Sequence, residues 1–336
     1  MSGPPIADAV EELTPEWFTD ALRDGGTIDD EAAVTSAESR AIGTGQLGSV
    51  VLSELAYEGA PDAPPTLIAK LPSSEETARQ MGIALRVYEA EVRFYQELAP
   101  LIEMPTPHLH WGGIEPETGR FTLVLDDLSP LADVGDVMAG ATREQMELAM
   151  RGLAGLQAPL WDEPRLQEMT WLSDLGRTEM LFGAVPQALE PFTERFGDLL
   201  EPEHVALARE LGPKSPSVVA KIWRPPFVVS HGDYRADNLL FGKTPEAEPL
   251  TVIDWQGTRL GIPGLDVAYC LASSLGVEDR RAMEADLLVA YHEALVAAGV
   301  EGYALADARA SYRAASLWPL LALLPASLTL EQSERG

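Results

Sequence analysis

The chain contains the stretch Ser230-His231-Gly232-Asp233-Tyr234-Arg235-Ala236-Asp237-Asn238. Two apolar runs follow it, 239–241 and 250–253, separated by a segment that contains glycine and proline, and the second run leads directly into Asp254. This pattern predicts two short strands joined by a turn. Because a hairpin returns the chain to the level at which it started, we expect Asp254 to come next to Asn238.

Three polar side chains of this region, Asp233, Asn238 and Asp254, have the chemistry that phosphoryl transfer requires. One carboxylate accepts the proton of the attacking hydroxyl, while an amide and a second carboxylate hold the magnesium ions that neutralise the triphosphate. Taken alone, His231-Gly232-Asp233 reads as an ordinary turn. The offsets of the asparagine and of the second aspartate favour the catalytic interpretation, with Asp233 as base and the other two residues as magnesium ligands.

A glycine-rich stretch, Gly43-Thr44-Gly45-Gln46-Leu47-Gly48-Ser49-Val50, lies in the first third of the chain. Glycines at the tip of a hairpin allow close approach to phosphates, because no Cβ stands in the way. A plain β-turn accounts for the glycines equally well. The same spacing occurs in dinucleotide-binding folds, where it opens a helix. Strand-like residues follow here, so we reject the dinucleotide-binding interpretation.

Lys70 lies inside the apolar run Thr66–Pro72 and is one of four lysines in the chain. The run predicts a strand. A lone lysine in a strand can also serve to protect a sheet edge from aggregation. The segment that follows favours a functional interpretation.

Residues 73–98 predict one helix, opened by a capping box of Ser73 with Glu76. Projected at the helical period, Glu91 falls inside a wide apolar arc, whereas Glu89 lies on the solvent side. A carboxylate on a core-facing surface is costly unless a cation meets it. We therefore expect Glu91 to pair with Lys70, the alternative being a surface arginine.

Together with Leu125-Asp126-Asp127-Leu128, these motifs resemble the aminoglycoside phosphotransferase and choline kinase superfamily, and most closely its ecdysteroid-kinase-like branch. The resemblance implies an α+β fold of the bilobal protein-kinase type, with ATP between the lobes. Residues 1–127 would form an antiparallel sheet lobe with one helix, followed by a hinge at about 125–130. Residues 131–336 would form a larger, mainly helical lobe with the catalytic loop 230–241, the metal motif 252–256 and the acceptor pocket.

The nucleotide site that the resemblance implies begins in the sheet lobe. There Gly43, Gly45 and Gly48 would cover the phosphates of ATP, and Lys70, held by Glu91, would bind them.

The hinge would meet the adenine through backbone groups around Asp126, Asp127 and Leu128. Asp266 matches a family aspartate that we expect to cap the N-terminus of a helix over 267–274.

The acceptor implied by the resemblance is a hydroxyl group of a small molecule, such as an aminoglycoside, a macrolide, a steroid-like alcohol or an amino alcohol. Gln157 stands where many relatives have histidine, which puts a substrate contact there in doubt. Gly232 replaces the arginine of protein kinases and no Ala-Pro-Glu segment follows Asp254, so a protein substrate is disfavoured. A nucleotide-binding pseudokinase that acts as a switch or scaffold is the alternative, although no expected catalytic residue is missing.

Composition excludes several other classes. A formal net charge of −29 is incompatible with the basic patches needed to bind nucleic acid or anionic lipid, and it weakly favours a cationic or neutral acceptor. No apolar run approaches the length of a membrane span. The single Cys270 lies in an apolar segment and the N-terminus lacks the pattern of a signal peptide, so we expect a cytoplasmic protein.

Overall fold

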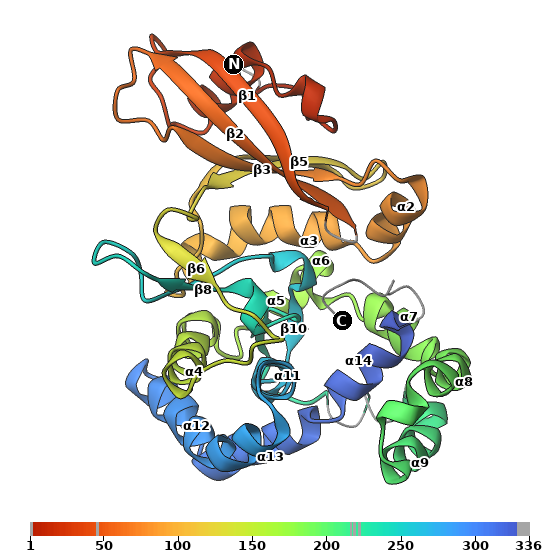
Figure 1. Ribbon diagram of the computed structural model, residues 1–336. Coiled ribbons are helices and arrows are strands. Elements are labelled where there is room, and N and C mark those ends of the chain that lie inside the picture. Colours follow the sequence, from red (N-terminus) through yellow and green to blue (C-terminus); the bar gives the residue numbers. More distant parts are fainter. Residues whose placement is uncertain (1–2, 45–46, 216, 218–219, 221–222, 328–336) are drawn as a thin grey trace. The chain divides into compact units, whose positions relative to one another are not determined.

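The computed structural model describes residues 3–44, 47–215, 217, 220 and 223–327 (Figure 1). The chain divides into two units, each built from more than one segment. The first takes in the chain up to Leu101 together with Pro105–Asp133 and Gly242–Gly257. The second takes in Ile102–Met104, Val134–Phe241 and the chain from Thr258 onward. Asp254 therefore belongs to the first unit, and the loop that carries Asp233 belongs to the second.

A five-stranded sheet with the order β1-β2-β3-β5-β4 forms the first unit, and all its neighbouring strands are antiparallel (Figure 1). Its strands are β1 (Ala33–Thr44), β2 (Gly48–Glu58), β3 (Thr66–Pro72), β4 (Leu109–Glu115) and β5 (Arg120–Asp126). Buried and more exposed residues alternate along β3, as the period of two in a strand requires. The predicted strand around Lys70 is therefore confirmed.

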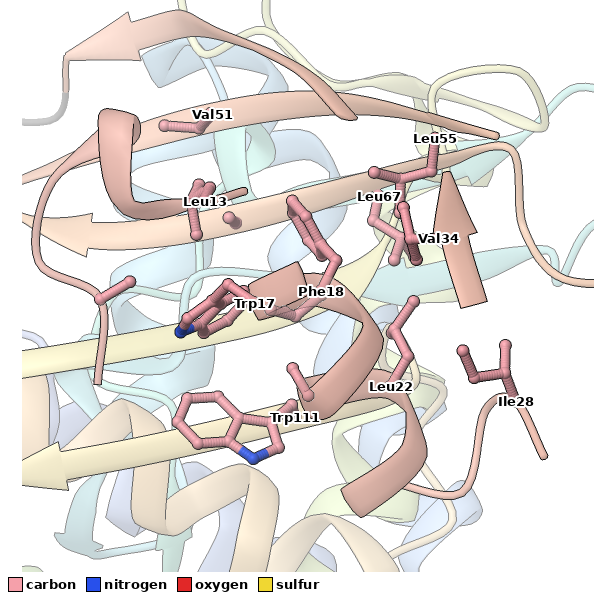
Figure 2. Close-up of a cluster of buried hydrophobic side chains, with 14 of the residues drawn as sticks. Leu13, Trp17, Phe18, Leu22, Ile28, Val34, Val51, Leu55, Leu67 and Trp111 are labelled. Atoms are coloured by element: carbon pink, nitrogen blue, oxygen red, sulfur yellow. The ribbon is translucent and has the colours of Figure 1, made fainter. Parts of the chain in front are cut away.

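Helix α1 (Pro15–Asp24) packs against this sheet. The Thr14 hydroxyl accepts a hydrogen bond from the Trp17 N–H at 3.2 Å and caps the helix, and Pro15 occupies its first turn. Figure 2 shows the buried cluster that results, in which aromatic and aliphatic side chains of the helix meet side chains of the sheet. Its members include Trp17, Phe18, Leu22, Val51, Leu55, Leu67 and Trp111.

The segment after β3 is where the structure departs from the single helix predicted over 73–98. It contains α2 (Glu76–Ala84), α3 (Val87–Arg93) and the π-helical turn η2 (Phe94–Leu98). Arg86 has a φ of 52°, and this left-handed residue separates α2 from α3. The predicted capping box is also wrong, because the Ser73 hydroxyl accepts the Glu75 N–H and no side chain caps α2.

The second unit is mainly helical. Its helices are α4 (Arg143–Gln157), α5 (Arg165–Glu168), α6 (Thr170–Ser173), α7 (Gly176–Gly183), α8 (Val185–Phe196), α9 (Pro202–Leu211), α11 (Gly264–Ser274), α12 (Val277–Ala297), α13 (Leu305–Ala315) and α14 (Trp318–Ala326). Helix α4 packs along α12, and α11 packs against α13 and α14. No helix in the described part of the chain combines the length and the apolar character of a membrane span.

Short strands complete the fold. They are β6 (Ala132–Val134), β7 (Val228–Ser230), β8 (Leu239–Gly242), β9 (Leu250–Val252) and β10 (Arg259–Gly261). β7 and β10 pair antiparallel in the second unit, and β8 and β9 lie where the sequence predicts strands. Isolated helical turns are η1 (Val10–Glu12), η3 (Ala99–Leu101), η4 (Ala158–Leu160), η5 (Gly197–Leu199), η6 (Gly212–Lys214), η7 (Ala236–Asn238) and η8 (Trp255–Gly257). The predicted α+β architecture, an antiparallel sheet part and a larger helical part, is confirmed.

Candidate functional site

Lys70 is the centre of an ion-pair cluster in the first unit. Its Nζ atom lies 2.5 Å from Glu91 Oε1 and 2.7 Å from Asp254 Oδ1. Ala69 and Leu71 belong to the cluster under α1, so strand alternation directs Lys70 to the opposite face of the sheet, where α3 supplies Glu91. The predicted pairing of Lys70 with Glu91 is confirmed.

Electrostatics keep this lysine charged. Burial disfavours its ammonium charge, but the carboxylates of Asp254 and Glu91 outweigh burial and raise the pKa of Lys70 above its ordinary value. Burial also raises the pKa of Glu91, with the Lys70 charge opposing this shift and the Asp254 charge adding to it. Lys70 is therefore a permanent cation held between two acidic side chains.

The environment of the Glu89 side chain differs from the one predicted. Its side chain is 9% exposed and pairs with Arg86 and Arg93, each with a shortest contact of 2.8 Å. The expectation that it projects to solvent is wrong, because the two long arginine side chains cover it. Glu89 is thus a buried carboxylate of α3 that has no contact with Lys70 among the described residues.

The backbone around Asp254 is fixed by its neighbours. Trp255 stacks on Phe94 of η2 with ring centroids 3.7 Å apart and an interplanar angle of 6°, and its indole N–H donates to the Val252 carbonyl at 3.0 Å. Asp254 itself has a φ of 66°, a left-handed conformation that aspartate tolerates better than most residues. Gln256 donates to Asp254 Oδ2 at 3.2 Å. The carboxylate is therefore oriented by both its backbone and its partners.

The glycine-rich stretch joins β1 to β2. A Cβ atom on Gly43 would meet nothing within 4 Å, whereas one on Gly48 would lie 3.0 Å from the Leu71 carbonyl oxygen. Gly48 is thus needed for the close approach of β2 to β3, and Gly43 leaves open space. The Tyr88 hydroxyl of α3 donates to the Leu47 carbonyl and ties this turn to α3. Gly45 lies outside the described residues.

Asp126 ends β5 and uses its side chain within the first unit. His110 Nε2 donates to one carboxylate oxygen at 2.8 Å and the His108 N–H donates to the other at 3.0 Å. Burial would raise the pKa of Asp126, but these hydrogen bonds outweigh it and lower the pKa. Asp127 and Leu128 follow in a half-buried turn, where Asp127 Oδ1 accepts the Ser129 N–H.

In the second unit, Asp233 and Asn238 lie on one loop and contact each other. Asn238 Nδ2 donates to the Asp233 carbonyl at 2.8 Å and to Asp233 Oδ2 at 3.1 Å. Arg235 Nε lies 3.3 Å from Asp233 Oδ1. Arg235 is a partner of Asp233 that the sequence did not predict.

Asp266 holds the backbone of this loop. Its buried carboxylate accepts hydrogen bonds from the Ser230 hydroxyl at 2.8 Å and from the N–H groups of His231 and Gly232, both at 2.9 Å. The predicted N-cap role is wrong, because α11 begins at Gly264 and Asp266 lies within its first turn. His231 Nδ1 accepts the Asp233 N–H at 3.2 Å, so this histidine supports the backbone of the loop.

Gln157 is fully buried in the second unit. The Tyr291 hydroxyl donates to its Oε1 at 2.6 Å, and its Nε2 lies 3.5 Å from the Pro263 carbonyl. This side chain links α4 to α12, so it is structural.

The oxygen donors that could bind magnesium are individual side chains and do not form a cluster of ligands among the described residues. Among the described residues, no three histidine, cysteine or acidic side chains gather into a metal site. Magnesium usually takes only one or two protein ligands beside phosphates and water, and it prefers oxygen donors. Asp254 offers a carboxylate, and Asn238 uses its amide nitrogen in its hydrogen bonds, which leaves the amide oxygen for a metal. Each of these residues, Asp254 in the first unit and Asn238 in the second, thus offers an oxygen of the kind that magnesium prefers.

Comparison with known protein families identifies the family of this chain. Residues 54–311 match the Phosphotransferase enzyme family, and the match covers more than half of the chain. The chain belongs to this family of phosphotransferases.

The fold is also found in solved structures. An ethanolamine kinase from Plasmodium vivax superposes with a TM-score of 0.57 at 10% identity, over 95% of this chain and 84% of that one. The GDP complex of an aminoglycoside 2'-phosphotransferase gives 0.48 at 18% identity, over 88% and 94%. An aminoglycoside phosphotransferase from Streptomyces rimosus with ADP and streptomycin gives 0.46 at 16% identity, over 84% and 91%. Only the first score exceeds 0.5, and at that identity it supports the kinase-like fold alone.

A curated relative matches a short segment. Mouse acyl-CoA dehydrogenase family member 10 is 56% identical over 43 residues, which are 12% of this chain and 4% of that protein.

Proposed function

We propose that this protein transfers the γ-phosphoryl group of Mg-ATP to a hydroxyl group of a small molecule. The observation that carries the proposal is Lys70, a buried lysine held by Glu91 of α3 and by Asp254. A lysine–glutamate pair of this kind orients the ammonium toward nucleotide phosphates in kinases. Membership of the phosphotransferase family supports the same reaction class.

The first unit binds the nucleotide in this proposal. Lys70 contacts the α- and β-phosphates, and Gly43, Gly45 and Gly48 cover them. Open space beside Gly43 supports this role, because a side chain there would occupy the volume that a phosphate needs.

The segment after β5 meets the base of the nucleotide. The Asp126 N–H already donates to the His108 carbonyl at 3.2 Å, and the Leu128 carbonyl already accepts the Leu131 and Ala132 N–H groups, both at 3.0 Å. The backbone groups of Asp127 and the N–H of Leu128 therefore take the larger share of the contacts to adenine. The Asp126 side chain fixes this segment through the His110 hydrogen bond.

Magnesium would be held by Asp254 and Asn238. When bound, it neutralises charge on the β- and γ-phosphates. Lys70 would exchange part of its contact with Asp254 for the phosphates, with Glu91 keeping the ammonium in place. Asn238 would offer its amide oxygen to the ion, while its amide nitrogen would keep its hydrogen bonds to Asp233.

Asp233 receives the proton of the acceptor hydroxyl. As the bond between the acceptor oxygen and the γ-phosphorus forms, the bond from that phosphorus to the bridging oxygen of ADP breaks, and the hydroxyl proton passes to the Asp233 carboxylate. Asn238 donates to this carboxylate and Arg235 Nε lies 3.3 Å from it, so its orientation is set before the acceptor arrives.

The acceptor class is a hydroxylated small molecule. Gly232 stands where protein kinases have an arginine. Helix α11 begins soon after Asp254, where the activation segment of a protein kinase would lie. Aminoglycosides, macrolides, steroid-like alcohols and amino alcohols such as ethanolamine are the candidates.

The buried thiol of Cys270 and the absence of a second cysteine fit a reducing cytoplasm.

The test is ADP release from Mg-ATP in the presence of each acceptor class, measured for the wild type and for Asp233→Ala. We expect one class to stimulate ADP release and the variant to lose the stimulation. Tyr312→Phe serves as a control, because this tyrosine hydroxyl donates to Glu284 of α12 instead of Asp233. Stimulation that persists in Asp233→Ala would refute the role of this carboxylate.

A further inference from the structure

Arg235 lies beside the carboxylate of Asp233 in the second unit. Its Nε atom is 3.3 Å from Asp233 Oδ1, and its Nη1 atom is 3.5 Å from Asp237 Oδ2. Both distances are longer than the separation of about 2.7–2.9 Å that is usual for a charge-assisted hydrogen bond. The guanidinium is therefore shared between two carboxylates, and neither of them holds it tightly.

The backbone that carries Arg235 is fixed by its neighbours in the chain. Tyr234 and Ala236, on either side, are almost completely buried. The Tyr234 hydroxyl donates to a backbone carbonyl of α4 and the Ala236 N–H donates to a serine hydroxyl of α11, both at 2.9 Å. Asp233, Arg235 and Asp237 alternate with these two residues and are only half-buried. The arginine thus has a rigid attachment and a charged end that is free to change partners.

Phosphoryl transfer brings negative charge to this loop in the proposed function. A hydroxyl that gives its proton to Asp233 lies about 3 Å from that carboxylate, and the phosphorus that it attacks lies about 3 Å further on. The γ-phosphate therefore comes within about 6 Å of a carboxylate, where like charges repel each other. Between Ser230 and Asn238, Arg235 is the one residue with a permanent positive charge.

We propose that Arg235 is a catalytic residue whose guanidinium binds the γ-phosphate oxygens and stabilises their charge while the phosphoryl group moves to the acceptor. This inference rests on the proposed function, in which Asp233 receives the proton. A phosphate offers a guanidinium several charged oxygens in a geometry that suits paired hydrogen bonds, so Arg235 exchanges its long carboxylate contacts for phosphate oxygens. The bonds that form and break are those of the transfer itself, and Arg235 stays protonated throughout.

The experiment measures how much of the nucleotide affinity depends on the γ-phosphate. Calorimetric titrations compare Mg-ADP with the magnesium complex of adenylyl imidodiphosphate, an ATP analogue that keeps a γ-phosphate but resists its transfer. We expect Arg235→Met to bind the analogue about ten- to a hundredfold more weakly, as for loss of a hydrogen bond to a charged group, and to keep its affinity for Mg-ADP.

Arg143→Met is the matched control for this measurement. The Arg143 side chain is 42% exposed, close to the 37% of Arg235, and it also lies between two carboxylates, with Asp286 at 3.3 Å and Glu147 at 3.9 Å. This variant should keep the wild-type affinity for both nucleotides. Arg235→Lys retains the charge without the fork of donors, so it should recover part of the analogue affinity that Arg235→Met loses.

A rate measurement tests the catalytic part of the inference. In ADP release from Mg-ATP with water as the acceptor, we expect Arg235→Met to lower kcat by about a hundred- to a thousandfold, as for loss of one donor to a developing negative charge. Wild-type affinity for the analogue in Arg235→Met, or an equal loss of affinity for the analogue and for Mg-ADP, would overturn this inference. A wild-type rate in Asp233→Ala would instead overturn the proposed function of Asp233, so the two failures are distinguishable.

Discussion

Replacing Glu91 by glutamine removes the charge that holds Lys70 while it keeps the volume of the side chain. Glu89→Gln is the matched control, because Glu89 lies on the same helix, is similarly buried and pairs with two arginines instead of Lys70. The two variants therefore separate loss of a buried ion pair from loss of the lysine's orientation.

The size of the effect follows from what Lys70 retains. Removing one partner of a buried ion pair costs about 3–5 kcal/mol when the other charge is left alone. Here Asp254 stays 2.7 Å from the ammonium, so the loss is closer to that of one charged hydrogen bond, about 1.5–2 kcal/mol. In Glu91→Gln the lysine also has to leave its one remaining carboxylate to reach a phosphate. Since about 1.4 kcal/mol is tenfold in affinity, nucleotide binding should weaken by about ten- to thirtyfold.

The assay is calorimetric titration of each variant with Mg-ADP, beside urea unfolding of the same preparations. We expect both variants to lose similar stability and Glu91→Gln alone to lose nucleotide affinity. Equal affinities for Mg-ADP in the two variants would refute the reasoning, because Glu91 would then be a structural carboxylate like Glu89.

Four further substitutions test other parts of the structure. Gly48→Ala should lower the free energy of unfolding by about 1 kcal/mol, since its Cβ would crowd the Leu71 carbonyl at 3.0 Å, while Gly43→Ala should leave urea unfolding unchanged and weaken Mg-ADP binding. The pKa of Asp126 lies below its ordinary value of 3.8, so this carboxylate contributes stability above that pH, which is lost as the pH falls through the lowered pKa. Asp126→Asn should cost about 1 kcal/mol of unfolding free energy at pH 7. In thermal unfolding, the variant should also show a smaller loss of stability than the wild type below about pH 4. Asp266→Asn should destabilise the protein by about 3 kcal/mol in urea, because an amide cannot accept all three buried donors; unchanged stability would contradict its anchoring role.

Much of the candidate site could be predicted from the sequence because its signals are local. The helical period separates Glu91 from the solvent side of its helix, and an isolated lysine in an apolar strand then has one obvious partner. In the same way, the spacing within the loop brings Asp233 and Asn238 together. Short-range periodicity and residue chemistry are sufficient for such contacts.

The remainder depends on conformations and distant contacts that no local pattern carries. A single left-handed residue at Arg86 breaks a segment whose periodicity reads as one helix, and propensities do not anticipate it. Burial of Glu89 arises from arginine side chains folding over it. Asp266 meets the N–H groups of His231 and Gly232 only because β10 and α11 return to the loop.

The central claim is that Asp233 serves as the base for phosphoryl transfer to a small-molecule hydroxyl. Its most direct test follows a radioactive γ-phosphate from ATP into the acceptor that stimulates ADP release, with wild-type protein and Asp233→Asn side by side. We expect label on the acceptor hydroxyl with the wild type and at least a hundredfold less with the variant, at equal Mg-ADP affinity. Labelled acceptor formed at the wild-type rate by Asp233→Asn would contradict the central claim.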